Sequence, residues 1–196
     1  MTTNRVFTFT GEGPMEGAAL GVSELVRVEL ERHGWGAMRC GCGDSAEHVP
    51  LMFEAIVEAE TPQDMIGYTL DNHLEFNANL FEVAVPAVSV ILAALAGELS
   101  TRARDHLLIT LWRLAAGDAH NTEQALGRIG LGGECRAKTR EGLWLILQLG
   151  LTGSADDADT AADLRELIDL DDGRSAFYQA LLRQRASTKT ERRRSH

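Results

Sequence analysis

The sequence predicts an all-α protein, a curved α-solenoid of about eight or nine helices in stacked antiparallel pairs. Apolar residues recur at helical spacing over most of the chain, and residues typical of helix ends stand between these stretches. No stretch alternates between polar and apolar residues for long enough to build a sheet. With 196 residues, of which 44% are hydrophobic, the chain is long enough to bury the core of one domain.

The expected helices follow one another with short connections. The clearest start is at Thr61, a hydroxyl cap followed by Pro62 and by Asp64 in the first turn. The stretch 84–96 is apolar on all sides and predicts a central, fully covered helix. The full set of expected helices is 14–33, 45–60, 61–76, 84–96, 100–116, 121–128, 134–149, 159–170 and 174–186.

These helices form one predicted helical-repeat domain over residues 14–186. Residues 1–13 form an N-terminal segment, in which 6–9 alternates and is interpreted as an edge strand or an ordered tail. Residues 187–196 are highly charged and are predicted to form a basic flexible tail.

The composition indicates a cytoplasmic protein without a membrane partner. The N-terminus lacks the basic and apolar regions of a signal peptide, and the longest uncharged stretch, about 15 residues, is too short to span a bilayer. An odd number of cysteines, three, argues against a secreted disulfide framework.

The negative charge is concentrated in the first half of the chain. The formal charge is −10 overall, −11 over residues 1–98, −2 over 99–186 and +3 over the last ten. No Lys or Arg lies between Arg39 and Arg102, where ten carboxylates do. A surface with this charge would repel nucleic acid and attract a basic protein.

Two helix starts suggest an internal repeat. Val49-Pro50 and Val85-Pro86 are 36 residues apart, and each opens an apolar helix. With Arg102–Gly117, this arrangement resembles the HEAT-like repeat proteins common in actinobacterial genomes, most clearly over residues 44–117. Glu75-Phe76 departs from the aromatic-His pair often found before the segment between two repeats. The resemblance implies a curved stack of helix pairs that binds proteins through a concave surface, and it transfers no catalytic site.

The leading prediction is therefore a non-catalytic protein-binding module of the immunity or antitoxin type, with a basic partner. Trp35, in a glycine-rich loop, is the tryptophan expected to be exposed, whereas Trp112 and Trp144 are expected in the core. The predicted binding surface consists of Asp64, Asp71, Glu75, Glu54, Glu58 and Trp35.

The alternative is an enzyme or accessory protein of a natural-product pathway that uses the concave groove as a small-molecule pocket. Its acid–base candidates would be His73, Asp71, Glu75 and His106. His73 shares a predicted helical stripe with Ile66 and Leu70, which is also typical of a hydrogen-bonded core histidine.

No cofactor and no metal are predicted. Cys40-Gly41-Cys42, flanked by His33 and His48, offers zinc-ligating side chains. Structural zinc sites typically use two pairs of ligands with wider spacing, and no second cysteine pair follows. Cys40 and Cys42 are therefore weak metal candidates.

Overall fold

The computed structural model describes residues 22–194, with side chains up to residue 187. The expected strand or tail at 6–9 and the segment 1–13 lie outside the described residues. The prediction of a mostly helical, all-α protein is confirmed.

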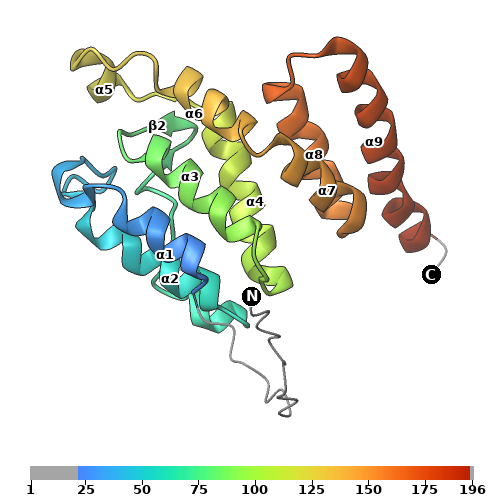
Figure 1. Cartoon of the computed structure of the whole chain (residues 1–196), viewed down its shortest axis with the longest axis horizontal. Coiled ribbons are helices and arrows are strands. Elements are labelled where there is room, and N and C mark those ends of the chain that lie inside the picture. Colours follow the sequence, from blue (N-terminus) through green and yellow to red (C-terminus); the bar gives the residue numbers. More distant parts are fainter. Residues whose placement is uncertain (1–21, 195–196) are drawn as a thin grey trace, which may run out of the picture.

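The helices are separated mostly by short connections. Within residues 22–194, three single 3₁₀ turns also occur: η1 (Trp35–Ala37), η2 (Ala46–His48) and η3 (Pro62–Met65). The α-helices are α1 (Glu24–Glu31), α2 (Val49–Glu58), α3 (Ala84–Leu95), α4 (Thr101–Ala116), α5 (Asn121–Ala125), α6 (Leu131–Arg140), α7 (Leu143–Thr152), α8 (Ala155–Ile168) and α9 (Asp172–Arg194). Figure 1 shows α1 and α2 on the left, α3 and α4 in the middle and α7, α8 and α9 on the right, while α5 lies back on the left, above α1.

Neighbouring helices share one hydrophobic core that extends from Val26 to Leu182. Helix α1 packs on α3, α3 on α4 and α6, and α4 on α6 and α8; α7, α8 and α9 contact one another. Helix α3 is buried on most of its surface, as its uniformly apolar sequence predicts. The expected cap of α4 is also present, because the Ser100 hydroxyl accepts a hydrogen bond from the backbone N–H of Ala103.

A small three-stranded sheet occupies the end of the molecule near α5, where no sheet was expected. Strand β1 (Glu75–Phe76) pairs antiparallel with β2 (Asn79–Leu80), which pairs parallel with β3 (Asp118–Ala119). Asn77 and Ala78 between β1 and β2 both have positive φ, as tight hairpin turns require. Each strand is only two residues long, too short to show alternation in the sequence.

The expected helix over 61–76 is wrong beyond its first turn. The predicted start is present, with Thr61 and Asp64 forming a capping box, but η3 ends after one turn. Gly67, with φ of +87°, and Asn72, with φ of 67°, adopt left-handed conformations that an α-helix cannot contain. Leu70 and Leu74 still reach the core, from an irregular loop.

Several other helix boundaries differ from the expectation. The helix expected over 14–33 is α1, which begins at Glu24 after the Ser23 cap, and α8 begins at Ala155, four residues before its expected start. The stretch 134–149 divides into α6 and α7 around Gly142, where a Cβ atom would lie 2.3 Å from Leu92 Cδ2. Helix α9 continues to Arg194, past residue 187, where the basic tail is expected to begin. The packing of α9 on α8, with Arg183 paired to Asp159 and Asp163, supports this helix.

The burial of the tryptophans is the reverse of the prediction. Trp35 is only 5% exposed, because its indole N–H donates to the Leu30 carbonyl at 2.6 Å and its ring packs near Phe53. Trp112 is 38% exposed and Trp144 is 62% exposed.

Candidate functional site

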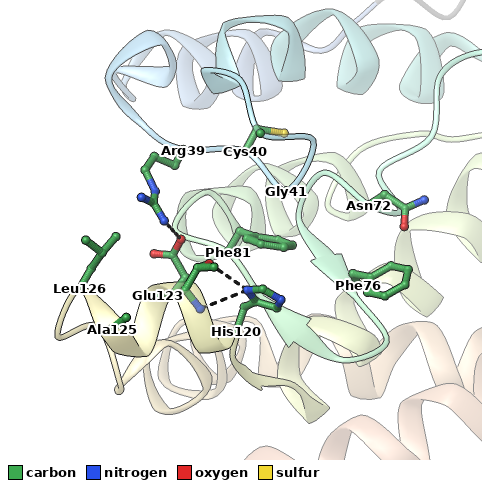
Figure 2. A pocket seen from close by; sticks show the side chains of 12 residues that line it. Arg39, Cys40, Gly41, Asn72, Phe76, Phe81, His120, Glu123, Ala125 and Leu126 are labelled. Atoms are coloured by element: carbon green, nitrogen blue, oxygen red, sulfur yellow. Dashed lines mark hydrogen bonds and ion pairs between the residues drawn. The ribbon is translucent and has the colours of Figure 1, made fainter.

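A pocket of about 640 Å³ lies between the loop 39–43, the loop that carries β1 and β2, and α5. Figure 2 shows Phe81 at its centre, Phe76 and Asn72 on one side, and Arg39, Glu123 and Leu126 on the other. Its volume is in the range of ligand-binding pockets. Several lining groups are polar, among them His120, whose ring bonds to the Thr122 hydroxyl at 2.8 Å.

A buried carboxylate anchors one wall of this pocket. Glu123, which is fully buried, accepts hydrogen bonds from the guanidinium groups of Arg39 at 3.0 Å and Arg128 at 3.1 Å. Arg128 also pairs with Glu82 at 2.6 Å, and Glu82 accepts from the Arg39 backbone N–H. This ion-pair network connects the loop 39–43 to α5 and to the start of α3.

Beside the pocket, four metal-ligating side chains converge. One ligand atom from each of Cys40, Cys42, His48 and His73 lies within 4.8 Å of the other three. His48 Nε2 and His73 Nδ1 are 2.9 Å apart, and Cys40 Sγ lies 3.2 Å from His73 Nδ1. Cys40 Sγ and Cys42 Sγ lie 3.5 Å and 3.8 Å from His48 Nε2.

The backbone of residues 40–44 explains how two cysteines so close in sequence face the same point. The Cys40 N–H donates to the Asp44 carbonyl, and the Gly43 N–H donates to the Cys40 carbonyl, forming a tight turn. Gly43 has φ of +97°, a conformation that favours glycine. The Gly41 N–H donates to the His73 carbonyl at 2.9 Å, which brings the loop carrying His73 against this turn.

The environment of the cluster keeps Cys40 and His73 uncharged when no cation is nearby. Burial raises the pKa of the Cys40 thiol to about 11. Burial, with a further contribution from His48, lowers the pKa of His73. Neutral thiol and imidazole groups at these distances can share hydrogen bonds. Once the thiols are deprotonated, the thiolates and the neutral imidazoles can coordinate a soft or borderline cation.

The sequence pointed to three of the four residues of this cluster. Cys40, Cys42 and His48 were recognised as zinc-ligating types, but His73 was placed on a helix and not connected to them. His33, the other flanking histidine, lies elsewhere, with its ring 3.5 Å from Glu29. The short C-x-C-x5-H spacing from Cys40 to His48 is the signal in the sequence that could have found three ligands.

The predicted acidic binding surface is divided by the fold. Asp71 forms an ion pair with Arg113, and Glu75 is only 6% exposed and accepts from the Ala78 N–H at 2.8 Å. Trp35 is buried, as described above, and Asp64 caps η3. Glu54 and Glu58 lie on α2 and form no ion pair with a described residue.

The four acid–base candidates do not share one pocket. A cavity of about 370 Å³ is lined by Asp71 and Glu75, together with Trp112 and Arg113, but not by His73 or His106. His73 belongs to the Cys–His cluster, and the buried His106 Nε2 on α4 has no hydrogen-bond partner in the described part of the chain.

His106 should make the protein less stable in mild acid. Burial lowers its pKa in the folded state, whereas in the unfolded chain the pKa is near 6.5. As the pH falls below about 6.5, the unfolded state therefore binds the proton first and folding stability decreases. We expect urea unfolding between pH 7 and pH 5 to show a smaller loss of stability in His106→Gln than in wild type. Equal losses would contradict a contribution from His106.

Comparison of the chain with protein-family models, with curated proteins and with solved structures gave no match. Over residues 22–194, no helix is long and apolar enough to cross a membrane.

Proposed function

We propose that this chain is a non-catalytic protein-binding module of the HEAT-like type, a curved α-solenoid that binds a basic partner. The observation that carries the proposal is the outward face of α2 with the turn before it. There the exposed Leu51 has Glu47, Glu54 and Glu58 at helical spacing around it. Glu47 and Glu54 have no ion-pair partner among the described residues, and Glu58 makes only a 3.4 Å contact with the Val22 N–H.

This face differs from the rest of the predicted acidic surface in being available to a partner. Asp71 and Glu75 are already engaged by Arg113 and by the Ala78 backbone N–H, so neither carboxylate is free to pair with a partner. An apolar side chain among free carboxylates suits a basic protein surface, because complementary charge steers association and the apolar contact excludes water. The packing of successive helices on one another, α3 on α4 and α7 on α8, supports a stacked arrangement, but the first predicted repeat unit lacks its second helix, which was expected over 61–76.

The proposed function does not include catalysis. The acid–base side chains of the alternative function are distributed among a Cys–His cluster, an ion pair with Arg113 and a buried position on α4. General acid–base catalysis requires such groups within hydrogen-bond reach of one bound substrate.

The test is affinity capture from a lysate with three immobilised baits. Wild type and a control variant, Glu98→Lys/Glu134→Lys, should retain a basic protein at low salt and release it at high salt. The test variant, Glu54→Lys/Glu58→Lys, changes the net charge by the same amount as the control variant. It should nevertheless lower the association rate of the purified partner by about tenfold or more. Equal retention by all three baits, or retention of no basic protein, would contradict the proposal.

A further inference from the structure

We propose that Cys40, Cys42, His48 and His73 bind one Zn²⁺ with tetrahedral coordination, and that this ion is structural. The proposal depends on the position of four side chains from three separate segments of the chain. It is independent of the partner-binding function, which rests on the outward face of α2.

Four of the six distances between ligand atoms are close to those of a tetrahedral site, and the other two, from Cys42 to Cys40 and to His73, are within 4.8 Å. With Zn–S near 2.3 Å and Zn–N near 2.0–2.1 Å, tetrahedral geometry separates ligand atoms by roughly 3.3–3.8 Å. The contacts among Cys40, His48 and His73 are 2.9, 3.2 and 3.5 Å, and the contact from Cys42 to His48 is 3.8 Å. A small expansion of the 2.9 Å pair admits the ion.

The donor set selects zinc and a structural role. Two sulfur and two imidazole ligands in tetrahedral arrangement are typical of Zn²⁺, whereas Ca²⁺ and Mg²⁺ require oxygen ligands. Two thiolates would neutralise the charge of the ion, which matters because Cys40 is only 4% exposed. Four protein ligands leave no open position for a substrate, as in structural zinc sites.

The ion would fasten segments that have little regular structure of their own. The tight turn 40–43 lies between the short 3₁₀ turns η1 and η2. His48 lies immediately before α2, and His73 lies in the loop before β1. Between the turn and this loop, the Gly41 N–H donates to the His73 carbonyl. Because Cys40 also lines the 640 Å³ pocket, a zinc ion here would hold one wall of that pocket in place.

The test is titration of the metal-free full-length chain with Co²⁺, which reports tetrahedral sulfur and nitrogen ligation through its visible absorption. We expect one Co²⁺ per chain, with intense visible bands and a thiolate-to-cobalt charge-transfer band, both removed by one equivalent of Zn²⁺. Thermal unfolding should shift to higher temperature with Zn²⁺. Weak bands typical of octahedral cobalt, or no binding, would overturn the proposal and leave the contacts as a hydrogen-bonded network.

Variants distinguish the four ligands from other thiols and imidazoles. Cys42→Ala and His48→Ala should each weaken Co²⁺ binding by at least about a hundredfold, since even changes outside the ligand shell cost 10- to 100-fold. The matched controls are Cys135→Ala, at a buried thiol on α6, and His33→Gln, which should both bind like wild type. Circular dichroism verifies that Cys42→Ala, at an exposed position, is folded. Unchanged binding by Cys42→Ala and His48→Ala would overturn the assignment.

Discussion

Replacing Phe53 with alanine should lower the free energy of unfolding by about 3–5 kcal/mol, the usual cost of deleting a buried aromatic ring. Phe53 is fully buried on α2 and packs near Trp35, which connects α1 and η1 to this part of the core. The cavity left by the missing ring would lie where η1, which carries Trp35, packs against α2. Urea unfolding should show the loss, together with a decrease in melting temperature of roughly 10 °C.

Leu51 provides the matched control on the same helix. It is 62% exposed, so Leu51→Ala should change stability by less than about 0.5 kcal/mol. Similar losses in Phe53→Ala and Leu51→Ala would mean that α2 does not pack as described. Leu51 is also part of the proposed binding face, so its variant separates a binding effect from a folding effect.

The second large loss of folding stability is expected when the two arginines beside the buried Glu123 are replaced. The double variant Arg39→Met/Arg128→Met keeps most of the side-chain volume but leaves a fully buried carboxylate without either cation. Breaking a buried ion pair from one side typically costs about 3–5 kcal/mol, because an uncompensated charge remains. Both arginines are partly exposed, so we expect a loss near the lower value, about 3 kcal/mol, in urea unfolding.

A rescue variant tests whether the buried charge is the cause. Adding Glu123→Gln to the double variant removes the charge and should recover a large part of the lost stability. Lys138→Met breaks an exposed pair with Glu141 and should leave the unfolding midpoint nearly unchanged. If the rescue variant is no more stable than the double variant, the loss comes from packing and not from charge.

Helices with strong local signals could be predicted from the sequence. The uniformly apolar stretch 84–96 became α3 and the Ser100 cap became the start of α4, because burial on all sides and a capping hydroxyl act within one segment. The stretch 61–76 had an equally clear start but ended after one turn. Its end depends on the left-handed residues Gly67 and Asn72 and on the pairing of Asp71 with Arg113, 42 residues away.

The predictions of which side chains are exposed were wrong because exposure also depends on residues far away in the sequence. Trp35 was expected to be exposed because it lies among glycines, yet the Leu30 carbonyl and Phe53 supply a buried environment for its ring. The acidic surface was predicted as one unit, but Arg113 on α4 pairs with Asp71 and lies near Glu75. Charge counted along a sequence does not show which carboxylates already have a cation beside them.

The helical class, the concentration of negative charge in the first half of the chain and the zinc-ligating residue types at Cys40, Cys42 and His48 can all be read from the sequence. These are properties of composition and of neighbours a few residues apart. That His73, 33 residues beyond Cys40, completes the cluster follows from the folded chain alone. The irregular loop around Asn72 turns the His73 side chain toward Cys40 and Cys42. A four-ligand site of this kind exists only where separate segments meet.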